Sequence, residues 1–492
     1  MTMNATREAA RTWKEVGPRV IALVAPALML LAGTSPAAGQ ALEELEPSVL
    51  EYVSVDEPAV ALVNVQVVDG TGAPPADDQT VLIRDGRIED VGPAAEVDVP
   101  GDAEVVDGEG HTVLPGLVGM HNHTFYTVGG RTVQLDYSSP RLYLGTGVTT
   151  IRTTGAASPF EEIEMKEDID RGGIPGPRMH VTGPYITGGS PSGHMQGVAT
   201  PEEAREFVDF WADEGATWFK AYTQISPEAL EAAIEAAHER GLRFTGHLCS
   251  VSFIEAVEMG IDNLEHGLFT NSDWHPDREP GDCPTDLRSH LAEVELDSPE
   301  VLETIGTMVD NEVPMSSTLA IYELLVPGRP PVEERFERAM HPDALEDYLS
   351  RKEEVDEGGE NSHWEELFRK GQEFERMFVE AGGLLGAGVD PTGMGGALPG
   401  FGDQRNYELF LEAGFEPAKA VEVLTLNGAR ILGEDDERGS VEPGKWADLV
   451  LIDGDPVERP EEIRDVVMVF RDGIGYDSEA LIRSVDGLVG ER

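Results

Sequence analysis

Cysteine is scarce in this sequence of 492 residues, where only Cys249 and Cys283 occur. Two cysteines cannot form the framework of disulfides that holds small secreted domains together, so we expect the fold to depend on an apolar core. Basic residues are also few, with 36 lysines and arginines against 93 aspartates and glutamates and a formal net charge of −57. Nucleic acid needs a basic surface for its phosphates, and this composition argues against it as a partner.

The excess of acidic residues predicts a protein adapted to salt. Mutual repulsion of like charges destabilises a compact state in dilute salt and is screened at high ionic strength. Disorder is the competing interpretation of so much charge. The 40% of hydrophobic residues and the regular succession of strand-like and helix-like patterns favour a folded, halophilic protein.

Long apolar runs are missing as well, and one short run lies at residues 20–32. Basic residues precede it and small residues at 37–41 follow it, an order that is typical of a secretory signal peptide. The run is short for a membrane span, Pro26 interrupts it, and no cysteine follows it to carry a lipid anchor. We therefore expect residues 1–41 to be a signal peptide and the mature protein to be exported, periplasmic or extracellular, and free of the membrane.

Two histidines stand at the end of a predicted buried strand. His121 and His123 close the apolar stretch that begins at His111, and the two-residue period of a strand places both imidazoles on the same side. Neutral imidazoles that converge on one point are half of a site for zinc or a similar divalent metal. A bare pair of this kind is more often two polar loop residues, so the prediction depends on further ligands.

Further candidate ligands repeat the pattern of a short apolar segment followed by a polar side chain. They are Lys220, His247, His266 and Asp390. Between the first two lies a predicted helix that begins after Ser226 and ends at Gly241, which gives one β-α-β unit. Similar units recur, and in a closed (β/α)8 barrel the carboxyl ends of all strands meet at one mouth. Ligands that are distant in the sequence are then close in space.

Lys220 is the unusual member of this set, because a protonated amine repels a cation. Burial beside Trp218 and Phe219 is expected to lower its pKa, and a neutral amine can add carbon dioxide to become a carbamate. The two oxygens of a carbamate can bridge two metals. The alternative role of Lys220 is an ordinary ion pair at a strand end.

Several short motifs, taken in order, resemble those of one superfamily. They lie at residues 115–123 (PGLVGMHNH), 219–222 (FKAY), 246–247 (GH), 265–267 (EHG), 389–391 (VDP), 425–433 (TLNGARILG) and 439–453 (GSVEPGKWADLVLID). From about residue 60 to about residue 455 the chain resembles the amidohydrolase superfamily. The most similar branch is that of the imidazolonepropionase-like and Xaa-Pro dipeptidase (prolidase-like) hydrolases, which use a carboxylated lysine.

The resemblance implies a binuclear centre with two divalent ions, zinc being the expected metal. The ligands would divide into a set for one ion, a set for the other and a bridge that is shared with a hydroxide: His121, His123 and Asp390; His247 and His266; and carboxylated Lys220. Asp390 would accept the proton of the nucleophile and deliver it to the leaving nitrogen. The implied reaction is hydrolysis of an amide-type bond in a dipeptide, an N-acyl amino acid or a cyclic amide.

Three residues are candidates for contacts with the substrate. His194 follows a glycine-rich stretch within residues 188–195 and could donate to a developing oxyanion, unless this loop is flexible surface. Tyr222 shares the face of Lys220 and either offers its phenol to the substrate carbonyl or packs in the barrel mouth. Arg152 could bind a substrate carboxylate, although a structural ion pair is its more usual role.

The expected architecture is α/β, with a (β/α)8 TIM-like barrel and a small β-sandwich built from both chain ends. The barrel is expected over residues 117–435 and the sandwich over residues 55–116 and 436–492, where short strands alternate with Asp-Gly turns. Two features depart from the resembling family. Gly119 stands where an acidic residue is usual, which puts hydrogen-bond support of the first histidines in doubt, and residues 271–371 look like a long acidic insertion.

Two other functions remain open at this point. A mononuclear deaminase on the same barrel would not need Lys220 as a carbamate. A non-catalytic exported binding protein would not need a full set of ligands. The expected partner is a small-molecule or peptide substrate, and a homo-oligomer is compatible with the sequence.

Overall fold

The computed structural model describes residues 39, 42–189, 193–358 and 362–491. Apart from Gly39, the expected signal peptide lies outside the described residues, as do residues 190–192 of the glycine-rich loop. Across the described part of the chain, no helix is both long enough and apolar enough to cross a bilayer.

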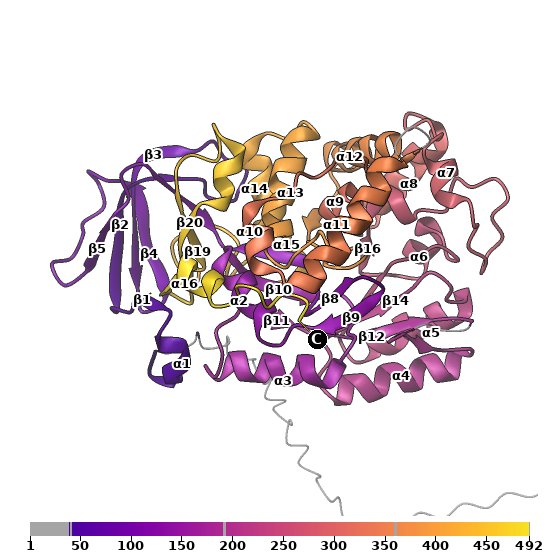
Figure 1. Cartoon of the computed structure of the whole chain (residues 1–492), viewed down its shortest axis with the longest axis horizontal. Coiled ribbons are helices and arrows are strands. Elements are labelled where there is room, and N and C mark those ends of the chain that lie inside the picture. Colours follow the sequence, from indigo (N-terminus) through magenta and orange to yellow (C-terminus); the bar gives the residue numbers. More distant parts are fainter. Residues whose placement is uncertain (1–38, 40–41, 190–192, 359–361, 492) are drawn as a thin grey trace, which may run out of the picture. The chain divides into compact units, whose positions relative to one another are not determined.

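A sheet of ten parallel strands positions the candidate ligands (Figure 1). Its order is β11-β10-β7-β18-β17-β16-β15-β14-β12-β13. The strands are β7 (Leu117–Asn122), β10 (Val148–Thr153), β11 (Arg178–His180), β12 (Thr182–Thr187), β13 (Gln196–Gly197), β14 (Trp218–Ala221), β15 (Arg243–Gly246), β16 (Asn263–Glu265), β17 (Met315–Ser317) and β18 (Leu385–Ala387). Most of these strands are buried along their whole length, as expected for a parallel sheet that is covered by helices.

The two ends of this strand order are neighbours in the chain. Only Val181 separates β11 from β12. β11 pairs with β10, whereas β12 pairs with β14. Within the order, β7 pairs with both β10 and β18.

Helices connect successive strands of the sheet. They are α2 (Ser138–Gly145), α3 (Pro159–Asp170), α4 (Pro201–Asp213), α5 (Pro227–Glu239), α6 (Phe253–Glu258), α8 (Pro299–Asp310) and α12 (Trp364–Glu380), followed after β18 by α13 (Phe401–Glu412), α14 (Pro417–Leu424) and α15 (Leu426–Leu432). The expected β-α-β unit is confirmed, because α5 runs between β14 and β15 and the Ser226 side chain accepts from the amide of Ala229 at its start. A proline in the first turn and this cap fix where the helix begins.

Strands from both chain ends form a second sheet of nine strands, which lies to the left in Figure 1. They are β1 (Val53–Val55), β2 (Ala59–Val67), β3 (Ala76–Arg84), β4 (Arg87–Pro93), β5 (Glu104–Asp107), β6 (His111–Pro115), β19 (Leu449–Asp453), β20 (Val466–Arg471) and β21 (Ile474–Asp477). The two ends meet where β19 pairs with β6 and where β21 pairs with β1, both antiparallel. This sheet has an apolar core of its own, to which Val60, Val113 and Phe470 belong.

Residues 271–371 are only partly an insertion, which corrects the sequence interpretation of this range. They contain α8 and β17, and β17 pairs with β16 on one side and β18 on the other, so part of the range belongs to the parallel sheet. The excess helices are α7 (Leu287–Leu291), α9 (Leu319–Glu323), α10 (Glu334–Ala339) and α11 (Pro342–Glu357). A strand of three residues among so many charged residues is too short to give a periodic signal.

The remaining elements are short. They are the 3-10 helices η1 (Leu42–Glu44), η2 (Gly267–Thr270) and η4 (Pro460–Arg464), the helices α1 (Pro47–Leu50) and α16 (Ser478–Arg483), and the hairpin of β8 (Phe125–Val128) and β9 (Arg131–Gln134).

Candidate metal centre

The six candidate ligands stand at or just after the ends of five strands of the parallel sheet. His121 is in β7 and Lys220 in β14, and the others follow their strands by one to three residues. Their side chains are buried except that of His247, which is half-buried. The prediction that distant ligands meet at one edge of the sheet therefore describes the structure correctly.

Distances show how closely these side chains converge. His121 Nε2 lies 3.7 Å from one Asp390 oxygen, and His123 Nε2 lies 3.4 Å from the other. Lys220 Nζ is 3.0 Å from His121 Nε2. The His266 ring is centred 4.5 Å from that of His121, and ligand atoms of His121, His266 and Asp390 all lie within 4.8 Å of one another. Such spacing suits side chains that share a cation between them.

The His247 ring joins the same cluster from the other side. Its centroid is 4.3 Å from that of His266 and 4.5 Å from that of Tyr222. All six predicted ligands therefore surround one region, and His266 lies close to both His121 and His247.

Outer hydrogen bonds orient three of the imidazoles. Nδ1 of His121 is 2.6 Å from Glu265, Nδ1 of His123 is 3.0 Å from the Gly155 carbonyl, and Nδ1 of His266 is 2.7 Å from the Thr318 hydroxyl. These contacts leave each Nε2 free to face the cluster. Nε2 of His266 is buried without a hydrogen-bond partner among the described residues, as expected for a nitrogen that serves as a metal ligand.

Burial also sets the protonation of the histidines. Loss of hydration lowers the pKa of His123 to about 4, even though Asp390 raises it. The same cause lowers the pKa of His121 and brings those of His247 and His266 well below the usual value. Neutral rings have the free lone pair that metal binding needs.

Glu265 is the residue of this site whose role the sequence did not reveal. Besides accepting from His121, it is bound by Arg152 at 2.5 Å and by the Asn263 amide at 3.1 Å. Burial raises the pKa of Glu265, but the nearby charge of Arg152 and the contact with His121 lower it overall. Glu265 directly precedes His266 in the EHG motif, and this position is the one feature of the sequence that could have indicated its role.

The prediction that Arg152 could bind a substrate carboxylate is wrong, because Arg152 does not line the pocket that a substrate could enter. Its side chain is fully buried and donates to Glu265 and to the Met120 carbonyl. It forms a structural ion pair with Glu265, which was expected to be its more usual role.

Gly119 departs from the family pattern for a steric reason. A Cβ atom at this position would lie 2.1 Å from Nδ2 of Asn122. The Asn122 side chain occupies the space, donating to Asp403 at 3.1 Å and accepting from the Val389 amide at 3.0 Å. Support of His121 by an acid comes from Glu265 instead.

Burial also affects the protonation of Lys220. It lowers the pKa of the Lys220 amine to about 8, although Glu265 and Asp390 raise this pKa. A larger fraction of this lysine is therefore neutral near physiological pH than of a solvated one.

The backbone at two ligands is strained. Asp390 has φ of +48° and His266 has φ of +67°, values that side chains with a Cβ rarely adopt. Strain of this kind persists only where the surroundings enforce it, and it gathers at functional sites. The Asp390 amide donates to the His121 carbonyl at 2.8 Å, which ties the loop to β7.

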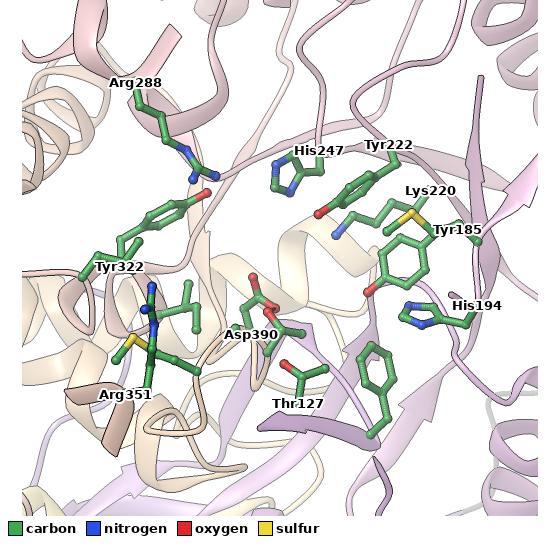
Figure 2. A pocket seen from close by; sticks show the side chains of 17 residues that line it. Thr127, Tyr185, His194, Lys220, Tyr222, His247, Arg288, Tyr322, Arg351 and Asp390 are labelled. Atoms are coloured by element: carbon green, nitrogen blue, oxygen red, sulfur yellow. Dashed lines mark hydrogen bonds between the residues drawn. The ribbon is translucent and has the colours of Figure 1, made fainter. Parts of the chain in front are cut away.

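A pocket of about 520 Å³ opens above the cluster (Figure 2). Lys220, His247 and Asp390 reach its floor, and the predicted substrate residues His194 and Tyr222 both line it. Further lining residues that sequence reasoning missed are Phe125, Tyr185, Arg288, Tyr322 and Arg351. They come from elements without a recognisable motif, so nothing in the sequence singled them out.

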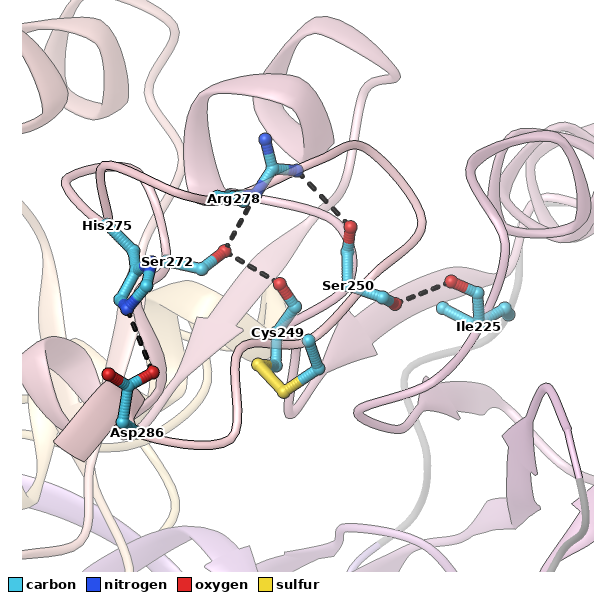
Figure 3. The surroundings of a disulfide bond; sticks show 8 residues. Ile225, Cys249, Ser250, Ser272, His275, Arg278 and Asp286 are labelled. Carbon is cyan, nitrogen blue, oxygen red and sulfur yellow. Dashed lines mark hydrogen bonds and ion pairs between the residues drawn. A yellow bond between two sulfur atoms is a disulfide. The ribbon is translucent and has the colours of Figure 1, made fainter.

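The two cysteines form one disulfide, although no disulfide was foreseen (Figure 3). Cys249 follows His247 by two residues, and the bond joins it to Cys283 with the Cα atoms 5.1 Å apart. The expectation that no framework of disulfides supports the fold still describes the chain, since the structure shows a single bond.

Comparison with known proteins assigns this chain to a family. The model of the Amidohydrolase family matches residues 112–273 and 331–474. Among solved structures, a putative prolidase from Bifidobacterium longum is 26% identical, with 87% of this chain and 98% of that chain covered and a TM-score of 0.61. A Xaa-Pro dipeptidase with bound methionine in the active site is 20% identical, with 85% and 100% covered and a TM-score of 0.63.

Curated relatives match over shorter stretches. An uncharacterized protein of Mycobacterium tuberculosis is 29% identical over 219 residues, which are 42% of this chain and 56% of that protein. An adenine deaminase of Clostridium botulinum is 42% identical over 65 residues, which are 13% of this chain and 11% of the deaminase. The chain thus spans about half the length of the first of these relatives and a small part of the second.

Proposed function

Because the chain belongs to the amidohydrolase family, we propose that it is a metal-dependent hydrolase that cleaves an amide-type carbon–nitrogen bond. The observation that carries this proposal is the convergence of six ligand-type side chains at one edge of the parallel sheet. Three of them, Lys220, His247 and Asp390, also line one pocket. The substrate is a small molecule or a peptide, such as a dipeptide, an N-acyl amino acid or a cyclic amide.

The donor set suits two divalent cations. His121, His123 and Asp390 would hold one, His247 and His266 the other, and Lys220 as a carbamate would bridge them. The unpartnered Nε2 of His266 and the lowered pKa of Lys220 support this assignment. Nitrogen and carboxylate ligands at this spacing suit Zn²⁺. Two such cations, when bound, lower the pKa of a water molecule and polarise a carbonyl.

The residues around the cations move the proton and hold the substrate. The neighbours His121, His123 and Lys220 lower the pKa of Asp390 despite its burial, so the carboxylate is ionised and one of its oxygens can take a proton. It then delivers this proton to the leaving nitrogen. Tyr222 and His194 face the pocket and can donate to the carbonyl oxygen as negative charge develops on it.

The test of this mechanism is Asp390→Asn. We expect turnover of a dipeptide and N-acyl amino-acid panel to fall by about 100-fold or more, with folding intact and most metal retained. Mass spectrometry of metal content and circular dichroism on the same samples check the second part. Asp297→Asn, an exposed acid outside the pocket, is the matched control. Full turnover in Asp390→Asn would remove the proposed role.

A mononuclear deaminase is the second candidate, favoured by the local match to an adenine deaminase. It would contain about one metal ion per chain instead of two, and it would release ammonia from an aminopurine. Full metal content without activity on either class of substrate would instead indicate a binding protein.

We further propose that the parallel sheet closes into a (β/α)8 barrel. The continuity of β11 and β12 supports closure, because it would join the two ends of the strand order. The separate core of the nine-stranded sheet supports a second small domain of the β-sandwich type. Export to the periplasm or the exterior, adaptation to salt and assembly with identical chains are proposals that depend on the sequence alone.

A further inference from the structure

Arg288 lines the pocket on the side of His247 and comes from α7, in the segment that carries no family motif. Its guanidinium faces the phenol of Tyr322 in Figure 2. The side chain is exposed to solvent, and its Cζ lies 5.4 Å from the centre of the Trp364 ring.

Arg288 differs from most of the other described arginines in its lack of an acidic partner. All but three have a carboxylate within 4.0 Å, and two of these three, Arg141 and Arg243, donate to backbone carbonyls. Among the described residues, Arg288 has neither a carboxylate nor a carbonyl partner, and its guanidinium makes a side-chain hydrogen bond with the Tyr322 phenol. In a chain with 93 acidic residues and 36 basic ones, an arginine that lines a pocket without a carboxylate partner among the described residues is unusual.

The pocket has a different character at each side of its floor. Tyr185, whose ring is centred 6.5 Å from that of Phe125, lies on one side in Figure 2, whereas Arg288 and Arg351 lie on the other. Arg351 already pairs with Glu354, and the one acidic residue among the described lining, Asp390, belongs to the ligand cluster. A net positive charge is therefore left at Arg288.

We propose that Arg288 binds a carboxylate of the substrate. The enzyme would then act on amides that have a free carboxylate on one side of the scissile bond and an apolar group on the other. A guanidinium offers paired donors that match the two oxygens of a carboxylate. This assignment rests on the proposed hydrolase function and adds the class of substrate.

The disulfide and its neighbours hold Arg288 in place for this task. Cys283 precedes Arg288 by five residues, and its bond to Cys249 joins this segment to the loop that carries His247. The Ser272 hydroxyl donates to the Cys249 carbonyl at 2.7 Å, and His275 lies 3.2 Å from Asp286 (Figure 3). A charge on a fixed segment binds an anion with less loss of conformational freedom than a charge on a mobile arm.

The test compares free acids with their carboxamides. A panel of dipeptides and N-acetyl amino acids is assayed on the metal-loaded full chain, each compound in both forms. We expect wild type to prefer the acids and Arg288→Met to lower kcat/KM for them by about 10- to 100-fold, mainly through KM, with little change for the carboxamides. Methionine keeps an unbranched stem over Trp364, and Arg288→Lys should retain part of the preference.

Arg483→Met is the matched control, because it removes one exposed positive charge outside the pocket, paired with Glu479. It should change neither form of substrate. Equal hydrolysis of acids and carboxamides by wild type, or an equal loss on both in Arg288→Met, would overturn the assignment and leave the hydrolase function standing. Hydrolysis of no compound at full metal content would overturn the hydrolase function itself and with it the assignment.

Discussion

The properties of His121 at the candidate metal centre depend on the side chains that contact it. The imidazole of His121 touches Lys220 on one side and Glu265 on the other, and Glu265 is itself held by the charge of Arg152. An ionised carboxylate behind a histidine fixes its tautomer and raises its strength as a ligand. The buried ion pair of Arg152 and Glu265 therefore serves to orient His121, which explains why an arginine this close to the pocket does not reach it.

Another buried carboxyl predicts how stability depends on pH. Glu162 lies on α3, and burial raises its pKa to about 8 from an ordinary value of 4.5. The folded protein keeps this proton between those values, whereas the unfolded chain releases it, so stability falls as pH rises through this window. In Glu162→Gln this contribution is absent.

Urea unfolding of metal-saturated protein measures the effect. Relative to Glu162→Gln, wild type should lose about 2 kcal/mol of unfolding free energy between pH 6 and pH 8. The control is Glu164→Gln, an exposed neighbour on the same helix. Parallel pH profiles for wild type and Glu162→Gln would show that this carboxyl is ionised in the folded state.

At the scale of elements, the sequence predicts those parts of the site that follow a repeated rule. Each ligand follows a short apolar strand, and parallel strands bring such positions to one edge of the sheet, so His121, Lys220 and His266 could be placed together beforehand. Arg288 and Tyr322 could not, because they come from short helices between β16 and β18 whose packing has no periodic signature. The three residues of β17 could not be predicted as a strand for the same reason.

The disulfide is a further contact between distant elements that spacing alone does not reveal. Cys249 and Cys283 are 34 residues apart, and a bond across a loop of this length restricts the unfolded chain. Cys249→Ser combined with Cys283→Ser should lower the unfolding free energy by about 4 kcal/mol on the loop-entropy scale.

Urea unfolding of oxidised wild type, reduced wild type and the double variant tests this prediction, with thiol titration to confirm each state. Reduced wild type is the control for effects of the serines themselves. If oxidised wild type and the double variant unfold at the same urea concentration, the bond does not stabilise the fold.

At the scale of the whole molecule, charge is the dominant property. If each of the 36 basic residues paired with one carboxylate, 57 of the 93 acidic residues would still lack a cation. The helical pairs Arg369–Glu373 and Arg376–Glu380 use both arginines of α12. The surplus carboxylates repel one another in the folded state and less so in the expanded chain.

Salt should therefore stabilise this protein in a characteristic way. The screening length falls from about 30 Å at 0.01 M salt to about 3 Å at 1 M, so the melting temperature should rise steeply with potassium chloride at low concentrations and level off near 1 M. Sucrose is the control, because it strengthens apolar burial without screening charge. Melting is followed at constant metal concentration, since bound cations also stabilise the folded state. A flat profile from dilute to molar salt, or an equal rise in sucrose, would mean that the acidic surface does not limit stability and that its link to saline surroundings is wrong.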